Sequence, residues 1–196
     1  MLPAEFAEVA SISMEFIGSM HLHSCGLCSK EEARHIRLQQ LESQGMEGTL
    51  LALPMIVRGD AFLHWVYEHP EQALNPEAVG RKWVELGRRF EPDLDWSDLE
   101  AENSHGWQYI LHFFDGPFYY INYAIAIIGA LQVWRNYLSD PQGTIQQYRQ
   151  ALALGATRSL PELYRAAGAT FAFDVPLLQE MVQLVTGKIE ELGQEV

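Results

Sequence analysis

The feature that most constrains the fold of this chain is a recurring helix-start signal, with few strand signals in between. A serine followed three residues later by glutamate satisfies orphan backbone amides at a helix N-terminus, and this capping-box spacing occurs three times. An Asn or Asp before Pro pairs an N-cap residue with a first helical residue that needs no N–H. The signals are Ser29 with Glu32, Ser97 with Glu100, Ser159 with Glu162, Asn75-Pro76 and Asp140-Pro141. They predict an all-α, multi-helix chain.

These signals divide the sequence into a series of helices. We expect them over residues 4–20, 30–69, 76–90, 97–111, 117–138, 141–154, 160–167 and 174–192. Pro54 should bend or break the second, because proline removes a backbone donor. The apolar run from Phe118 to Trp134 is interrupted by Asn122 and Gln132, so we expect a buried central helix instead of a membrane span. No repeat or linker is apparent, and we expect one helical domain over residues 1–196.

Charge and composition exclude some classes of partner. The 196 residues include 26 acidic and 13 basic side chains, for a formal net charge of −13. Such a surface repels nucleic-acid phosphates and anionic lipids, so we expect neither nucleic acid nor membrane as a partner. The first residues, MLPAEFAEVAS, place no basic residue before their apolar stretch, unlike a secretory signal. We therefore expect a cytoplasmic protein.

Two carboxylates share a face of the first expected helix. Glu8 and Glu15 are seven residues apart, which returns to nearly the same side of an α-helix, and Ser11 lies on that side too. Carboxylates placed in this way can act as a metal ligand and as its supporting group. A solvated acidic stripe is the alternative.

A second group of polar aromatic residues occurs in HFFDGPFYYINYA, residues 112–124. Asp115-Gly116-Pro117 is typical of a turn that precedes a helix. Tyr120 and Tyr123 are three residues apart and share a helix face, and His112 lies just upstream. An imidazole and two phenols can hydrogen-bond a peptide carbonyl or a developing oxyanion. The alternative is an aromatic core helix with satisfied hydroxyls.

A third pattern concentrates metal-binding residue types in one short loop. His21, His23, Cys25 and Cys28 offer four potential zinc ligands within eight residues, but no second anchoring segment is evident. An ordinary loop between helices is the alternative, and we expect no tightly held zinc there. The histidines of HWVYEH, residues 64–69, are five apart and so diverge around a helix, which argues against a zinc pair.

Taken together, EFAEVASISMEF and HFFDGPFYYINYA resemble the oligoendopeptidase F branch of the thimet-type zinc peptidases. The stretches FLHWVYEHPE at 62–71 and LGATRSLPELYRAAG at 154–168 add to the resemblance, which runs from about residue 3 to residue 190. It implies an all-α fold, the C-terminal half of a zinc oligopeptidase catalytic domain. In that family, two histidines of an H-E-x-x-H helix and a later glutamate bind zinc, and the motif glutamate activates water.

The resemblance implies a role for each matching residue. Glu8 corresponds to the later zinc-binding glutamate, and Glu15 to a supporting acidic position. His112 corresponds to a histidine that contacts substrate. Tyr120 and Tyr123 correspond to tyrosines that hold the peptide and the tetrahedral intermediate.

The sequence departs from the family in one respect that decides our expectation. H-E-x-x-H does not occur in it, and the segment would lie upstream of Glu8, which only seven residues precede. One carboxylate does not make a three-ligand catalytic zinc site. We therefore expect a chain that binds short peptides and supplies the third zinc ligand, but is inactive alone. It would act with a separately encoded H-E-x-x-H half, or as a homodimer. The alternatives are a non-catalytic peptide- or protein-binding remnant, and a small metal-binding protein that uses the His21–Cys28 loop.

Overall fold

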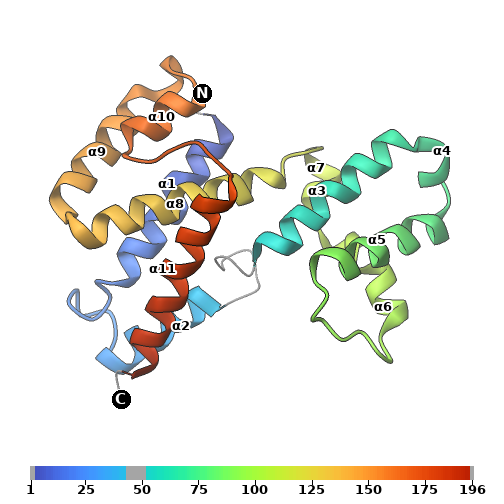
Figure 1. Ribbon diagram of the computed structural model, residues 1–196, viewed down its shortest axis with the longest axis horizontal. Coiled ribbons are helices and arrows are strands. Elements are labelled where there is room, and N and C mark those ends of the chain that lie inside the picture. Colours follow the sequence, from blue (N-terminus) through green and yellow to red (C-terminus); the bar gives the residue numbers. More distant parts are fainter. Residues whose placement is uncertain (1–2, 43–51, 195–196) are drawn as a thin grey trace. The chain divides into compact units, whose positions relative to one another are not determined.

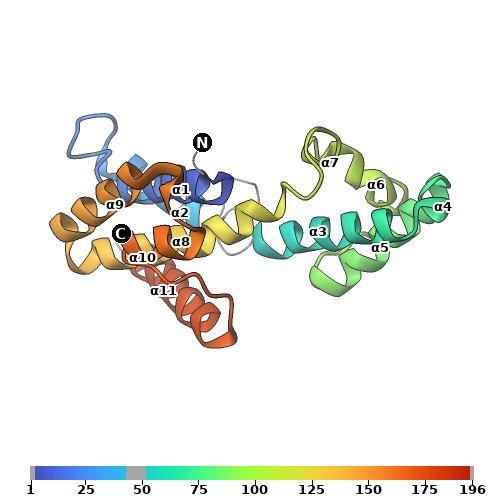
Figure 2. The same ribbon diagram turned by 90° about the horizontal axis from the view of Figure 1, so that it is seen from above.

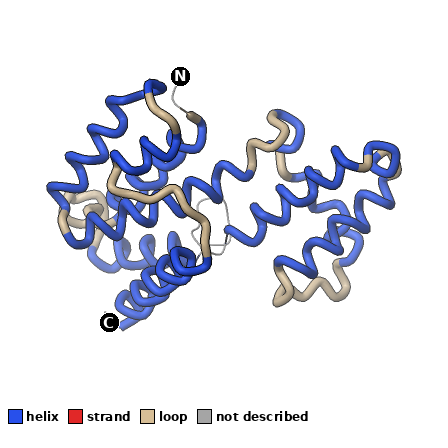
Figure 3. The backbone as a smooth tube through the Cα atoms, turned by 45° about the horizontal axis from the view of Figure 1, so that its top comes forward, coloured by secondary structure: helices blue, strands red, loops and turns tan. Residues whose placement is uncertain are grey.

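The computed structural model describes residues 3–42 and 52–194, and both ranges consist of helices and loops without a strand (Figure 3). The expected all-α class is confirmed. The chain forms two compact units: unit 1 comprises Met1–Leu51 and Ile125–Val196, and unit 2 comprises Ala52–Ala124. A single domain over residues 1–196 stays a prediction.

Unit 1 is built around the apolar centre of one long helix, α8 (Ile121–Ser139), which enters it at Ile125. Every residue from Ala126 to Trp134 is buried. In this unit α1 packs on α2 and α10, α9 packs on α10, and α11 packs on α2 (Figure 1). The other helices of unit 1 are α1 (Ala4–Ser19), α2 (Lys30–Glu42), α9 (Pro141–Leu154), the 3-10 turn η2 (Gly155–Thr157), α10 (Leu160–Ala166) and α11 (Val175–Gln194).

Unit 2 is organised by a helical hairpin. Helix α3 (Ala52–Glu68) packs against α5 (Pro76–Phe90), and the short α4 (Pro70–Ala73) connects them (Figure 2). Phe62 of α3 meets Val79, Trp83 and Leu86 of α5 in the core between the two helices. The remaining elements are α6 (Glu100–His105), the 3-10 turn η1 (Gly106–Tyr109) and α7 (His112–Asp115).

Most of the expected helix starts are confirmed by hydrogen bonds. Glu32 accepts from the Ser29 amide at 2.8 Å, and Glu162 accepts from the Ser159 amide at 2.9 Å. The Asn75 side chain accepts from the Glu77 and Ala78 amides, and Asp140 accepts from the Gly143 amide. These contacts lie within one turn of sequence, which is why they can be predicted locally.

Two expected helices are wrong in extent. The predicted helix 97–111 is replaced by α6 and η1, because the Ser97 amide donates to Asp95 and Asp98 has a positive φ of 67°. The predicted helix 117–138 begins four residues later, at Ile121. Within 30–69, α2 ends at Glu42, α3 begins at Ala52 with Pro54 in its first turn, and 43–51 lie outside the described residues. No helix in the described ranges has the length and apolar character to cross a membrane.

Candidate functional site

The carboxylates predicted on the first helix lie on α1, in unit 1. Glu8 is half-buried and Glu15 is exposed. The Ser11 hydroxyl lies 3.2 Å from Oε2 of Glu8, so the serine is a hydrogen-bond donor to this carboxylate, as their shared helix face suggested. Ile12, the residue after Ser11, packs into the core of the unit.

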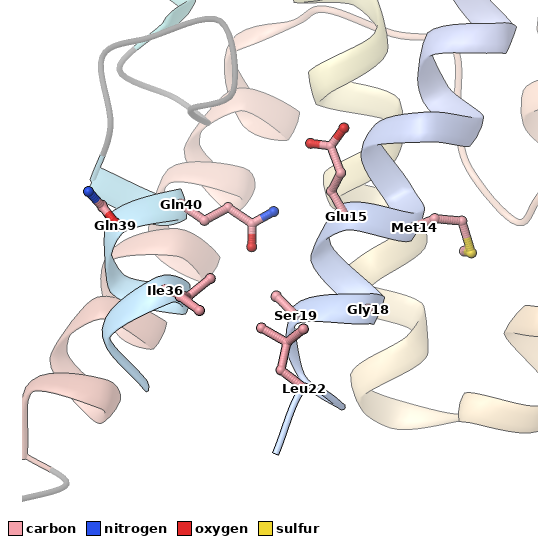
Figure 4. Close-up of a pocket in the computed structure, with 8 residues that line it drawn as sticks. All are labelled: Met14, Glu15, Gly18, Ser19, Leu22, Ile36, Gln39 and Gln40. Atoms are coloured by element: carbon pink, nitrogen blue, oxygen red, sulfur yellow. The ribbon is translucent and has the colours of Figure 1, made fainter. Parts of the chain in front are cut away.

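An open groove of about 640 Å³ separates α1 from α2. Figure 4 shows Glu15 on the α1 side of this groove and Gln40 on the α2 side. Among the described residues, its walls mix apolar and polar side chains and include no histidine or cysteine. They are formed by Met14, Glu15, Gly18, Ser19, Leu22, Ile36, Gln39 and Gln40.

The residues on α1 do not by themselves fit a catalytic zinc ion. Zinc in such sites takes three protein ligands, and Glu8 offers one carboxylate. In residues 3–42 and 52–194, no three His, Cys, Asp or Glu side chains are grouped so that they could hold a metal ion. The described residues therefore provide no complete set of zinc ligands, and no reaction step through a metal follows from them.

The His21–Cys28 loop connects α1 to α2, and its two histidines have other partners. Nε2 of His21 lies 2.7 Å from the Tyr137 hydroxyl on α8. Nδ1 of His23 lies 3.2 Å from the backbone carbonyl of Cys28, while Cys25 is exposed and both thiols are free. As described, these four residues do not form a metal-binding group.

The predicted polar aromatic residues come together in unit 2. Nε2 of His112, on α7, lies 3.2 Å from the hydroxyl of Tyr123, on α8. The His112 ring also stacks on Tyr119 and on Tyr120, with centroids 5.7 Å apart in both pairs, and meets Tyr123 edge-on at 5.3 Å. We call His112, Tyr119, Tyr120 and Tyr123 the His112 cluster. Tyr119 was missed by sequence reasoning, although it lies beside Tyr120 in the motif.

Tyr120 is the buried member of this cluster, with only 1% of its surface exposed. Its ring packs edge-on against Phe113 and lies against Gly59 of α3, where an added Cβ would approach Tyr120 to 2.8 Å. Burial raises the pKa of Tyr120 to about 12, and the negative charge of Glu91 adds to the effect. His112, Tyr119 and Tyr123 are half-buried, so solvent reaches them.

A buried ion pair tied to α3, α5 and α6 was also missed. The Arg58 side chain, on α3, donates to Glu91 at 2.7 Å, to the Trp83 carbonyl at 3.0 Å and to Asn103 at 3.2 Å. Its guanidinium also lies over the Trp83 ring at 3.8 Å. Burial lowers the pKa of Arg58, while Glu91 opposes the shift. No local pattern marks such a pair, because Arg58 and Glu91 are 33 residues apart, and the other two partners of Arg58 are 25 and 45 residues from it.

The chain between α7 and α8 contains an unusual backbone conformation. Phe118 has a positive φ of 61°, which costs about 1–3 kcal/mol in a non-glycine residue. Its ring packs against His64 and Tyr67 of α3, at centroid distances of 4.9 and 5.1 Å. The other histidine of HWVYEH, His69, instead stacks on Trp65, so the two histidines have separate partners.

Comparison with known proteins places this arrangement in a family. No curated protein matches the chain. Among solved structures, "PZ peptidase A with inhibitor 2" is 28% identical, with a TM-score of 0.83 over 95% of this chain. A "putative oligoendopeptidase F" structure is 29% identical, with a TM-score of 0.79 over 100% of this chain. The chain spans 32% of the length of each. The sequence profile of peptidase family M3 matches residues 1–183. The chain belongs to peptidase family M3.

Proposed function

We propose that this chain is the peptide-binding portion of a zinc oligopeptidase, that it supplies one zinc ligand, and that it is inactive alone. Family membership supports peptides as the substrate class, since the match covers residues 1–183. The observation that carries the proposal is the hydrogen bond between His112 and Tyr123, set in a cluster of tyrosine rings. In the proposal, residues 1–196 act as a single helical domain.

The His112 cluster has the chemistry that peptide binding requires. The imidazole and the phenol are half-buried and 3.2 Å apart. When Nε2 of His112 donates to the Tyr123 oxygen, the Tyr123 O–H can donate to a peptide carbonyl or to the oxyanion that forms from it. Tyr120, at 1% exposure, is covered in this conformation. A direct contact between Tyr120 and the peptide would require the side chains around it to move. Without such movement, the Tyr120 ring supports the His112 ring and does not contact the peptide.

The metal role proposed for Glu8 follows from the family resemblance. The Glu8 carboxylate would provide one oxygen ligand, with Glu15 in support. Zinc, when bound, polarises a carbonyl and lowers the pKa of a coordinated water. The described residues hold no group of three possible ligands. In the proposal, the remaining ligands and the base come from outside these 196 residues, for example from a separately encoded H-E-x-x-H half or a second copy.

The first prediction concerns turnover. The pure 196-residue chain with added zinc should not cleave a fluorogenic peptide, because it offers one ligand and no H-E-x-x-H base. A recombinant N-terminal portion of a family M3 peptidase, carrying H-E-x-x-H, should restore chelator-sensitive cleavage. In that complex, Glu8→Ala should abolish turnover. Tyr123→Phe should lower kcat about 100- to 1,000-fold, the usual cost of losing one oxyanion donor.

Tyr109→Phe is the matched control, because Tyr109 is 90% exposed and lies outside the His112 cluster. Its kcat should stay at the wild-type value. Chelator-sensitive cleavage by the pure chain would contradict the predicted inactivity. An active complex that is indifferent to Glu8→Ala would contradict the assigned ligand.

A non-catalytic binding module is the second candidate, and exposed apolar side chains favour it. Leu111 and Phe114, which lie on either side of His112 in sequence, are 64% and 60% exposed. Exposed apolar side chains mark a binding surface where they adjoin one another. A remnant of this kind would bind peptides without turnover even in the complemented complex, which separates the two candidates.

A further inference from the structure

The segment that joins α7 to α8 is a tight turn with an unusual third residue. The Tyr119 amide donates to the Gly116 carbonyl at 3.0 Å, which closes a four-residue β-turn. Pro117 occupies the second position, where its ring holds φ negative. A negative φ there and a positive φ at the third position define a type II turn, which normally has Gly or Asn third. Here the third residue is Phe118, at φ 61°.

Contacts with α3 explain how a phenylalanine is tolerated in this position. The Phe118 ring lies 4.9 Å from the His64 ring and 5.1 Å from the Tyr67 ring, both centroid to centroid. All three residues belong to unit 2. Unfavourable conformations of this kind persist only where the surroundings hold them in place, and they gather at functional sites.

The turn determines the direction of the next side chain. Tyr119 directly follows Phe118, and its ring is nearly parallel to the His112 imidazole, at 6° and 5.7 Å. The Tyr119 carbonyl accepts from the Asn122 amide at 3.0 Å, so the same residue also contacts the first turn of α8. If Phe118 relaxed to a negative φ, the backbone at Tyr119 would rotate and its ring would leave the imidazole.

We propose that Phe118 is a positioning residue whose left-handed turn places Tyr119 against His112, making Tyr119 a wall of the His112 cluster. The benefit to peptide binding rests on the proposed function. The positioning itself is a property of the chain alone and can be tested without turnover.

The test separates backbone conformation from side-chain packing by two matched pairs of substitutions. Gly and Asn adopt a positive φ more readily than Ala and Leu do. Two-dimensional NMR of the full chain measures the cross-peaks between the Tyr119 and His112 rings. Phe118→Gly and Phe118→Asn should retain these cross-peaks, whereas Phe118→Ala and Phe118→Leu should lose them. Leu74→Ala, which removes an 85% exposed apolar side chain from the same unit, should leave them unchanged.

If Phe118 acted only through the packing of its side chain, a different set of variants would keep the cross-peaks. Leu fills an apolar site better than Asn does, so Phe118→Leu would then retain the cross-peaks and Phe118→Asn would lose them. That result would overturn the proposal, as would cross-peaks that persist or vanish in all four variants. Circular dichroism of each variant checks that the helices have formed. If the Gly variant does not fold, the Asn and Leu pair decides the question by itself.

Discussion

At the scale of single residues, His112 illustrates how far local sequence leads. The motif predicted that His112, Tyr120 and Tyr123 would lie close together, and the rings are in contact. It did not predict that Tyr120 would be buried and Tyr123 only half-buried. That difference is set by Gly59, which lies against the Tyr120 ring from a position 61 residues earlier in the chain. Gly59 has no side chain to hold the ring away, so the phenol is buried and its pKa rises.

The free energy of unfolding above pH 10 should depend on whether the Tyr120 phenol is buried. Below pH 10 the Tyr120 phenol is protonated whether the chain is folded or unfolded. The raised pKa therefore does not change the free energy of unfolding in this range. Between pH 10 and about 12, the unfolded phenol loses its proton and the folded one keeps it, so the free energy of unfolding falls as pH rises. We expect Tyr120→Phe to reduce this fall, measured by urea unfolding at about pH 9 and about pH 11.

Tyr109→Phe, at an exposed position, should show the same fall as the wild type. Burial also raises the pKa values of Tyr148 and Tyr164, but both residues remain in each variant and cancel from the comparison. An identical loss of stability in the two variants would mean that the Tyr120 phenol titrates like an exposed one.

At the scale of elements, unit 1 contains a set of side-chain hydrogen bonds between α8 and the loop that follows α10. We call it a clamp, and no helix-start signal indicates it. Gln132, buried on α8, donates to the Thr170 carbonyl at 3.0 Å and accepts from the Thr170 amide at 2.9 Å. One turn later, Asn136 donates to the Gly168 carbonyl at 2.8 Å. Together the two amide side chains satisfy backbone groups of the loop between α10 and α11. Gln132 interrupts an apolar run in the sequence, and this clamp is the physical reason for it.

Gln132→Leu should therefore lower stability although it makes α8 more apolar. Losing the bonds to Thr170 should cost about 1–3 kcal/mol, moderated because Thr170 is exposed and water can replace the lost partner. Hydrogen exchange should show faster exchange at the Thr170 amide. Gln150→Leu, at an exposed position on α9, should change stability by no more than about 0.5 kcal/mol. Unchanged protection at Thr170 in Gln132→Leu would argue against the clamp.

At the scale of the whole molecule, the chain spans 32% of the length of the two family M3 relatives. Its exposed large apolar side chains include Leu27, Leu74, Tyr109, Leu111, Phe114 and Val175. Exposed apolar surface favours association when its residues adjoin. Three of these residues lie within 109–114 and are the best candidates for such a surface: Tyr109 ends η1, Leu111 directly precedes α7, and Phe114 lies in α7.

We therefore predict that the isolated chain forms a homodimer or a larger complex. Light scattering across a concentration series should show a mass above 22.3 kDa. Combined Leu111→Gln and Phe114→Gln substitutions should shift the equilibrium toward monomer, because they remove apolar area from 109–114. Leu74→Gln, a single exposed position on a different segment, is the control and should not. A monomeric wild-type chain at high concentration would contradict the prediction.

The sequence alone determined the helical class, most helix starts and the family, because caps and motifs depend on residues within a turn or two of one another. It also predicted that Tyr120 and Tyr123 would lie near His112, but not that Tyr119 would stack on it. Only the tertiary structure decided that the chain forms two compact units, that Tyr120 is buried, and that Arg58 pairs with Glu91. It also decided that Phe118 takes a left-handed conformation, which Pro117 permits and packing against His64 and Tyr67 stabilises. Burial, ion pairing and backbone strain depend on residues far apart in the chain, and local patterns do not carry that information.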